Sequence, residues 1–501
     1  MLAGRGDDEV RTVGSLADEQ LTIDGGAGDD TLLGSNGADV IRGGSGRDFV
    51  DGQQGADVAE LGDGPDTFQW DPGDSSDTVD GGDGDDVLDF NGSNIGEILD
   101  VSANGDRARL TCNVANIVMD LDGIERAALD PIGGSDAITV GDLSGTDLAA
   151  VDTSLDATGG GGDGQPDAVT ARGTDGADRF AVASEPGAVS VTGLGAQVRA
   201  TGIEPADDVN VDGAAGDDVT TYGGTADADD IAIVANGTEV RTTPAAAASF
   251  DTVAVEDLVV ATRGGADKVS AVGNLAPLTR ITMEGGRGSD TLLGSNGADL
   301  IRAGGADDFV DGQQGADVAE LGRGSDTFQW DPGDGNDVVE GGAGTDALAF
   351  NGSNIGELID VSANAGRTRL TRNIANIVMD LDGLERLGVR VLGGTDTVTV
   401  GDLGGTGVGD VDVDLALTGG ATDPVPDTVV VNGTEHRDVV RLTRSGDQVL
   451  ATGLAATTRI TGSELLSDTL RVLTHGGDDA VLVSPAVEVL ITPVIDLGAD
   501  E

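Results

Sequence analysis

Aspartate recurs at a fixed interval in two segments of this 501-residue sequence. Within each segment seven aspartates follow one another at nine-residue steps, apart from one eleven-residue step before the sixth: Asp30, Asp39, Asp48, Asp57, Asp66, Asp77 and Asp86, then Asp290, Asp299, Asp308, Asp317, Asp326, Asp337 and Asp346. Carboxylates are the hard oxygen ligands that calcium prefers, and neither segment contains a histidine or cysteine to suit a transition metal. These two series, the first and second aspartate combs, therefore predict repeated calcium sites.

The residues around each aspartate indicate how it would be positioned. The pattern is G-G-x-G-x-D-x-U-x, where U is apolar, as in GGAGDDTLL and GGSGRDFVD. Glycines permit positive φ angles, and hence a tight turn whose carbonyl groups point toward one place. The last three residues form a short strand with the apolar side chain facing inward. Each comb is therefore predicted to be a narrow solenoid of turns and short strands.

This tandem nonapeptide resembles the calcium-binding repeats of the bacterial repeats-in-toxin (RTX) or haemolysin-type family. The resemblance implies a parallel β-roll in which two nonapeptides complete one coil, so that Asp30 would stack near Asp48 and Asp39 near Asp57. It also implies that calcium is the cofactor and that the arrays fold when calcium binds. All fourteen comb aspartates are accordingly predicted to be calcium ligands.

The composition narrows the classes of function. Asp and Glu number 91 against 27 Lys and Arg, a net charge of -64, so the basic surface that nucleic acid requires is missing. Glycine occurs 83 times and aromatic residues make up 2%, which favours a thin, repetitive fold over a bulky core. The single Cys112 excludes an intramolecular disulfide. No segment is apolar enough to predict a membrane span.

The whole chain is organised as repeats. TLLGSNGAD occurs at 31–39 and again at 291–299, and FNGSNIGE at 90–97 recurs at 350–357. Valine- and threonine-rich alternating segments favour strands, and no segment has a helical period. The predicted fold is an all-β parallel β-roll or β-helix solenoid. Its predicted parts are the tail of an incomplete β unit (1–24), the first calcium-binding array (25–90), a β module (91–172), two units beginning with Gly-Thr (173–284), the second array (285–350), a second copy of the β module (351–432) and a C-terminal β unit (433–501).

Some residues near or outside the combs receive more ordinary interpretations. The turns that carry Asp217 and Asp218, Asp267, and Asp478 and Asp479 are expected to be solvated acidic turns without a metal. Trp70 and Trp330 are expected to pack against the protein instead of stacking on a sugar. Within the combs, Gly46 of the first is replaced by Ala306 in the second. If this position needs a positive φ, the turn of Asp308 is strained and the second array needs more calcium.

The sequence predicts a protein that is not an enzyme. It contains neither an H-E-x-x-H nor a G-x-S-x-G motif, and nothing beside Arg107, Arg109, Arg367 or Arg369 marks the substrate groove of a calcium-dependent lyase. We expect a calcium-binding structural protein, secreted or on the cell surface, with adhesion as one role. The start MLAGRGDDEV has no signal-peptide pattern, so export without a cleaved N-terminal signal is expected. The alternative is the non-catalytic, calcium-dependent part of a larger exported toxin or hydrolase, with its effector domain upstream.

Overall fold

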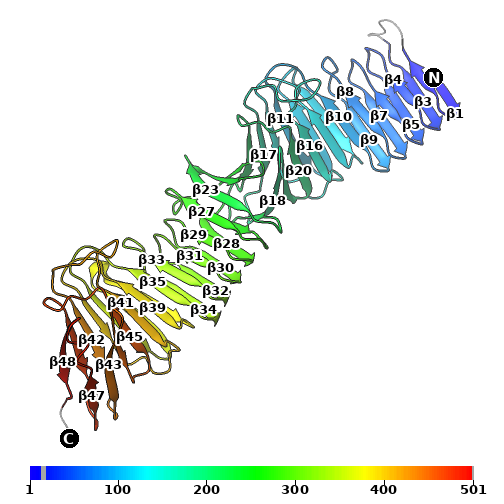
Figure 1. Ribbon diagram of the computed structural model, residues 1–501. Helices are drawn as coiled ribbons and strands as arrows, with labels where there is room; N and C mark the ends of the chain where they lie inside the picture. The colour runs from blue at the N-terminus through cyan, green and yellow to red at the C-terminus, as the bar shows by residue number, and fades with distance from the viewer. Residues whose placement is uncertain (13–18, 499–501) are drawn as a thin grey trace. The chain divides into compact units, whose positions relative to one another are not determined.

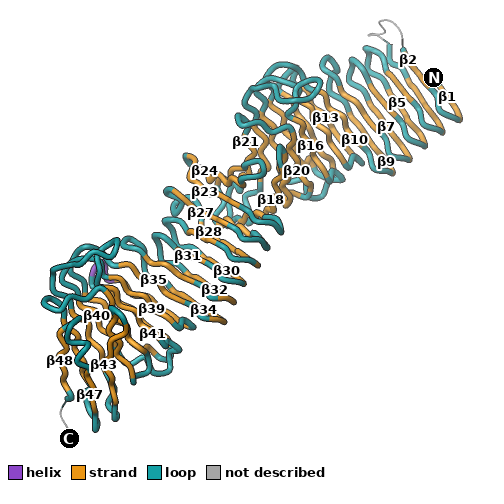
Figure 2. The backbone as a smooth tube through the Cα atoms, viewed as in Figure 1, coloured by secondary structure: helices purple, strands orange, loops and turns teal. Residues whose placement is uncertain are grey.

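The computed structural model describes residues 1–12 and 19–498, and its strands follow one another from end to end of the described chain (Figure 1). The chain forms two compact units, 1–223 with 232–258, and 224–231 with 259–501. The one helical element in the described ranges is the 3-10 turn η1 (Ile374–Asn376), so the predicted all-β class is confirmed (Figure 2). None of the described helices could cross a membrane. Residues 13–18, part of the predicted N-terminal tail, lie outside the described residues.

The first array consists of short parallel strands, each paired with the strand one coil later. Ile23 pairs with Ile41, which lies two strands later in the chain, and Leu32 pairs with Val50 in the same way. Two nonapeptides therefore complete one coil. Two strands that precede the array, β1 (Leu2–Arg5) and β2 (Glu9–Arg11), pair in parallel with its first two strands. The strands of the array are β3 (Thr22–Ala27), β4 (Thr31–Leu33), β5 (Val40–Ser45), β6 (Phe49–Asp51), β7 (Val58–Asp63), β8 (Thr67–Trp70), β9 (Thr78–Asp83) and β10 (Val87–Asn91).

The second array, in the second unit, repeats this construction. Ile301 pairs with Ala319, and Val310 pairs with Phe328. The strands are β28 (Arg280–Arg287), β29 (Thr291–Leu293), β30 (Leu300–Gly305), β31 (Phe309–Asp311), β32 (Val318–Gly324), β33 (Thr327–Trp330), β34 (Val338–Gly344) and β35 (Ala347–Asn351).

The core of each array is built from the inward side chains of its short strands. The apolar residue two positions after each comb aspartate is at most 1% exposed: Leu32, Ile41, Val50, Ala59, Phe68, Val79 and Leu88, and Leu292, Ile301, Val310, Ala319, Phe328, Val339 and Leu348. Burying one such Leu, Ile, Val or Phe side chain contributes about 1.5–3 kcal/mol. Because each coil supplies only two of these residues, the turns at the edges must contribute stability of their own.

Beyond the arrays, antiparallel hairpins enlarge the coils. In the first unit Asn104 pairs with Arg107, so the loop of this hairpin is Gly105 and Asp106. The hairpin strands are β11 (Ile98–Asn104), β12 (Arg107–Cys112), β13 (Ile117–Asp122), β18 (Arg179–Glu185), β19 (Ala188–Leu194), β20 (Ala196–Thr201), β23 (Asp230–Asn236), β24 (Glu239–Pro244), β25 (Phe250–Val253), β36 (Leu358–Asn364), β37 (Arg367–Arg372), β38 (Ile377–Asp382), β43 (Val439–Ser445), β44 (Gln448–Thr452) and β45 (Thr457–Thr461).

The remaining strands complete the coils between and after these hairpins. They are β14 (Arg126–Asp130), β15 (Ala137–Val140), β16 (Ala150–Ser154), β17 (Ala168–Arg172), β21 (Asp208–Asp212), β22 (Val219–Gly223), β26 (Asp257–Ala261), β27 (Lys268–Val272), β39 (Arg386–Arg390), β40 (Thr397–Val400), β41 (Asp410–Asp414), β42 (Thr428–Asn432), β46 (Thr469–Leu473), β47 (Ala480–Val483) and β48 (Thr492–Asp496). Most pair in parallel, for example Val169 with Val209.

The two tryptophans pack inside the coils, as predicted. Trp70 stacks on Phe90 with ring centroids 4.3 Å apart, and its indole N–H donates to the carbonyl oxygen of Ser75 over 2.8 Å. Trp330 stacks on Phe350 at the same centroid distance. Neither ring is available to a sugar, because Trp70 is 4% exposed and Trp330 is fully buried.

Candidate metal centres

The comb aspartates form hydrogen-bonded columns along the edges of each array. The backbone N–H of Asp30 donates to Oδ1 of Asp48 over 2.8 Å, and the N–H of Asp39 donates to Oδ1 of Asp57 over 2.7 Å. These are the two stacked pairs that the resemblance implied. The same bond, at 2.7–2.9 Å, links 48 to 66, 66 to 86 and 57 to 77, and in the second array 290 to 308, 308 to 326, 326 to 346, 299 to 317 and 317 to 337.

In most comb aspartates the second carboxylate oxygen is buried without a partner. All fourteen residues are at most 3% exposed. The Oδ2 atoms without a hydrogen bond belong to Asp30, Asp48, Asp57, Asp66 and Asp86, and to Asp290, Asp308, Asp317, Asp326, Asp337 and Asp346. Removing a carboxylate oxygen from water without a partner is strongly unfavourable unless its charge is neutralised. The columns therefore need a counter-charge, and none of the described residues donates a hydrogen bond to these oxygens.

Beside the first glycine of four of these turns, the unpaired oxygen of Asp30, Asp48, Asp86 or Asp290 lies close to a backbone carbonyl oxygen of the next coil. A Cβ built on Gly25 would lie 2.5 Å from Asp30 Oδ2 and 2.6 Å from the carbonyl oxygen of Gly43 in the next coil. A Cβ on Gly285 would lie equally close to Asp290 Oδ2 and to the carbonyl oxygen of Ala303. Carboxylate and carbonyl oxygens are the ligands of calcium, so the residues present fit this ion.

Carboxylates alone would not complete such a site. Within residues 1–12 and 19–498, no three acidic, histidine or cysteine side chains form a group that could hold a metal ion. Calcium takes about 6–8 oxygen ligands. Backbone carbonyl groups and water would therefore supply most of them, with one or two carboxylates supplying the charge.

Burial and mutual repulsion make the columns hard to ionise. Burial raises the pKa of Asp48 to about 6, and repulsion from Asp66 and Asp30 adds to this shift. Burial likewise raises the pKa of Asp57 to about 7 and that of Asp77 to about 8. In the second array it raises the pKa of Asp317 to about 8, with Asp337 as the nearest repelling carboxylate. A bound cation would remove this penalty because it favours the ionised form.

Not every acidic turn is of this kind, and the second residue of the turn decides which kind it is. Gly44 has a φ of 119° and its turn leaves Asp48 Oδ2 unpaired. Ser35, at the same place in its turn, has no positive φ, and its N–H donates to Asp39 Oδ2 over 2.6 Å. Turns that leave Oδ2 unpaired are called open here, and turns whose second residue donates its N–H to that oxygen are called closed.

Asp39 and Asp299 are thus the predicted ligands that differ most from the others. The N–H and the hydroxyl of Ser295 both donate to the carboxylate of Asp299, and Asp39 also accepts from the N–H of Leu21 over 2.8 Å. The carboxylates of both residues are satisfied within the protein. The sequence carries this signal as Gly-Ser in place of Gly-Gly, which the spacing alone did not reveal.

The prediction of solvated turns outside the combs is wrong for two aspartates. Asp218 is 0% exposed and Asp267 is 2% exposed, and Oδ2 of each has no partner. Both turns are open, because Ala214 (φ 65°) and Arg263 (φ 69°) place their second residue in the left-handed region. These turns have the same backbone conformation as the open turns of the combs, but they lack the nine-residue spacing by which the combs are recognised. Asp217 and Asp478 are exposed, and Asp479 is half-buried with an unpaired Oδ2.

The substitution of Gly46 by Ala306 changes a position that does have a positive φ. Gly46 has a φ of 135° and Ala306 has a φ of 101°. The strain expected for the alanine is therefore present. A further difference lies three residues earlier, where Gly43 is replaced by Ala303. Gly43 and Ala303 are both the first residue of their turn, five positions before Asp48 and Asp308.

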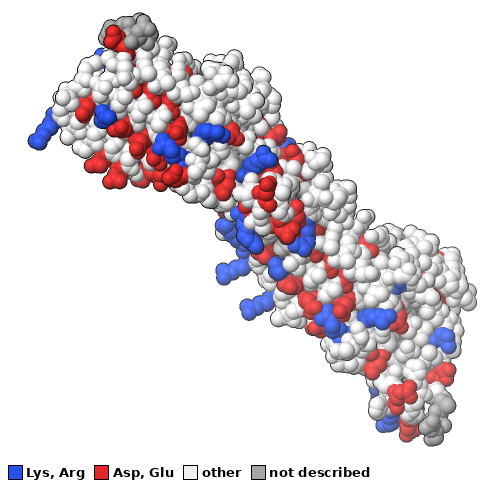
Figure 3. Space-filling view, turned by 180° about the vertical axis from the view of Figure 1, so that it is seen from behind, with Lys and Arg blue, Asp and Glu red and all other residues white. Residues whose placement is uncertain are grey.

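Two of the four arginines considered for a lyase, Arg107 and Arg367, are engaged in ion pairs. Arg107 contacts Asp120 and Asp122 over 2.7 Å each, and Arg367 contacts Glu340 over 2.8 Å and Asp380 over 2.7 Å. Acidic and basic side chains are interspersed over the face in Figure 3, whereas the comb aspartates are buried. Carboxylates beside a guanidinium favour its charged form, so these arginines suit a structural role better than proton abstraction.

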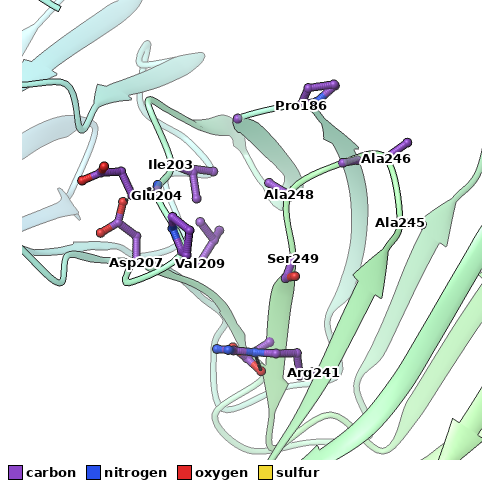
Figure 4. Close-up of a pocket in the computed structure, with 14 residues that line it drawn as sticks. Pro186, Ile203, Glu204, Asp207, Val209, Arg241, Ala245, Ala246, Ala248 and Ser249 are labelled. Carbon is purple, nitrogen blue, oxygen red and sulfur yellow. Dashed lines mark hydrogen bonds and ion pairs between the residues drawn. The ribbon is translucent and has the colours of Figure 1, made fainter. Parts of the chain in front are cut away.

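A cavity of about 420 Å³ lies elsewhere in the first unit (Figure 4). Arg241 lines it beside Ala245–Ala248, Glu204 and Asp207. The guanidinium of Arg241 forms ion pairs with Asp208 and with the buried Asp251. These carboxylates neutralise Arg241, so it serves as a cross-link between neighbouring strands.

Comparison with known proteins agrees with the geometry of the arrays. The family described as RTX calcium-binding nonapeptide repeat (four copies) matches residues 24–59, 33–68, 73–94, 284–319 and 333–354. No curated protein matches the chain. Among solved structures, the extracellular lipase LipA from Serratia marcescens is similar at 15% identity and a TM-score of 0.12, over 40% of this chain and 43% of the lipase chain. The chain thus spans less than half of that lipase.

Proposed function

Because both arrays consist of RTX calcium-binding nonapeptide repeats, we propose that this protein is a non-catalytic structural protein whose arrays fold when they bind calcium. The observation that carries the proposal is the column of buried Oδ2 atoms without a hydrogen-bond partner, each in an open turn. A divalent cation between successive turns would neutralise these oxygens and would add bonds to the carbonyl oxygens beside them.

The open turns supply the ligands that we assign first. They include the eleven comb aspartates whose Oδ2 is unpaired, and we add Asp77, whose pKa burial raises to about 8. Asp39 and Asp299 stay in the ligand set as weaker members, because calcium there must compete with the N–H groups of Ser35 and Ser295. Magnesium fits less well, since it demands a regular octahedral site and gives up its water reluctantly.

Calcium binding and folding are coupled in this proposal. Without a cation, like charges repel along each column, and the core of each array offers little to offset that repulsion. The free energy of calcium binding then becomes free energy of folding. Extracellular calcium modules bind at about 10⁻⁴–10⁻³ M, so the arrays would stay unfolded inside a cell and fold outside it. We accordingly place the protein outside the cell or at its surface, where adhesion is one role for such a structure.

Circular dichroism during a calcium titration tests the proposal. The chain in chelator is expected to show a largely disordered far-UV signal from the arrays, and millimolar calcium is expected to add β signal. The same concentration of magnesium serves as the control and should leave the spectrum nearly unchanged. Identical spectra in chelator and in calcium would contradict the coupling of folding to metal binding.

A further inference from the structure

An open turn that lies outside both arrays closely repeats the last turn of each array. This turn, 213–218, has the sequence GAAGDD, and its aspartate Asp218 is fully buried with Oδ2 unpaired. Oδ1 of Asp218 accepts the N–H of Asp178 from the preceding coil over 2.7 Å, as comb aspartates accept from their neighbours. Gly216, its fourth residue, has a φ of 139°, close to the 135° of Gly46.

The aspartate of each of these turns donates its backbone N–H to a glutamate of the following coil. At the end of the first array the N–H of Asp86 donates to Oε2 of Glu125 over 2.7 Å, and at the end of the second the N–H of Asp346 donates to Glu385 over 2.8 Å. The N–H of Asp218 donates in the same way to Oε2 of Glu256 over 2.8 Å.

The space beside the aspartate is also alike. A Cβ on Gly81 would lie 2.7 Å from Asp86 Oδ2, and its nearest neighbour would be the carbonyl oxygen of Gly123. A Cβ on Gly213 would lie 2.6 Å from Asp218 Oδ2, and its nearest neighbour would be the carbonyl oxygen of Ala254. A fully buried, unpaired carboxylate oxygen and a carbonyl oxygen of the next coil therefore face one space here, as they do at the end of the first array.

We propose that the turn 213–218 is a further calcium site, held by Asp218 Oδ2 together with the carbonyl oxygen of Ala254 in the next coil. This inference rests on the proposed function, because it extends calcium binding from the arrays to a segment that the RTX repeat family does not match. The site stands alone, since the preceding turn is closed: the N–H of Thr174 donates to Asp178 Oδ2 over 2.7 Å.

Hydrogen exchange of the full-length chain in chelator and in millimolar calcium tests this site. In the wild-type chain calcium is expected to slow exchange across 213–223 as well as across both arrays. Asp218→Asn keeps the shape of the side chain and an oxygen for the Asp178 N–H, and it removes the unpaired charge. We expect this variant to lose the calcium-dependent slowing at 213–223 and to keep it in the first array.

A matched control uses a closed turn of the same kind. Asp438 accepts the N–H of Thr434 over 2.7 Å, so Asp438→Asn should leave the response of 213–223 unchanged. A second variant should strengthen calcium binding at this turn. Ala214 has a φ of 65°, and Ala214→Gly relieves the strain of this left-handed backbone conformation. It should lower the calcium concentration needed for half of the slowing at 213–223 by about fivefold.

The outcomes separate this inference from the proposed function. If the arrays respond to calcium while 213–223 does not, or while Asp218→Asn responds there as the wild type does, the site at Asp218 is overturned and the arrays remain calcium sites. If no part of the chain responds to calcium, the proposed function itself fails. If Asp218→Asn loses protection at 213–223 in chelator as well as in calcium, the variant has a folding defect and does not test the site. Ala214→Gly then decides the question. If its calcium midpoint for slowed exchange at 213–223 equals that of the wild type, the site is overturned.

Discussion

The two arrays have nearly the same sequence and the same register, yet they differ at the positions that glycine occupies in the turn. Gly43 and Gly46 of the first array are Ala303 and Ala306 in the second, and the fourth residue keeps a positive φ in both, 135° for Gly46 and 101° for Ala306. Burial raises the pKa of Asp48 to about 6 and that of Asp308 to about 7. The comparison teaches that aspartate spacing sets the register of the coil, whereas the residues at the glycine positions set how strained each turn is.

Removing a carboxylate from the middle of a column should have the largest effect. Asp48 bonds to Asp30 on one side and to Asp66 on the other, so Asp48→Ala harms two sites at once. We expect the calcium concentration at the midpoint of folding of the first array to rise about tenfold or more, equivalent to roughly 1.4 kcal/mol or more. Asp100→Ala, in the following hairpin, is the control, and equal titration curves for the two variants would refute the pairing of turns.

The difference between the arrays should appear as a difference in calcium demand. An alanine in left-handed backbone is strained by about 1 kcal/mol relative to glycine, so the second array should need about fivefold more calcium than the first. Ala306→Gly should close most of that gap, and Gly46→Ala should create it in the first array. Hydrogen exchange of peptides from each array, followed over a calcium titration, measures both midpoints in one chain. Identical midpoints in the wild type would show that the fourth position tolerates alanine.

Acid should partly replace calcium in both arrays. Folded aspartates with a raised pKa bind more protons than the unfolded chain between the ordinary value of 3.8 and about 6 for Asp48 or about 7 for Asp308. The stability of the metal-free fold therefore falls as the pH rises through this window. Protection from exchange in chelator should therefore rise on acidification in both arrays. Protection that increases toward alkaline pH would contradict this sign.

The smallest effect is expected at the closed turns. Asp39→Asn and Asp299→Asn should each move the calcium midpoint by about twofold or less, because the serine of each turn already holds the carboxylate. Calorimetric titration of each variant beside Asp57→Asn, an open turn in the same column as Asp39, provides the comparison. Equal shifts of the calcium midpoint in Asp39→Asn and Asp57→Asn would contradict the distinction between open and closed turns.

Much of the array could be predicted from the sequence, because the interval between its aspartates is also the interval between its turns. The resemblance to RTX repeats, in which two nonapeptides complete one coil, implied that Asp30 lies beside Asp48, and the glycine at position 46 suggested a positive φ. The state of Oδ2 could not be predicted in the same way, because it depends on the φ of the second turn residue. Gln53 adopts 62° although it has a side chain, and its turn is open. Asp218 was predicted to lie in a solvated turn, because a single turn has no period that would relate it to the combs.

The most direct test of the account is a crystal structure grown in calcium, with anomalous scattering used to locate the ions. The account predicts peaks between successive open turns of each array, within about 2.3–2.6 Å of a comb Oδ2 atom and of backbone carbonyl oxygens. Occupancy should be highest along Asp30, Asp48, Asp66 and Asp86, and lowest beside Asp39 and Asp299. Comb carboxylates surrounded only by water, with no anomalous peak near any Oδ2, would contradict it.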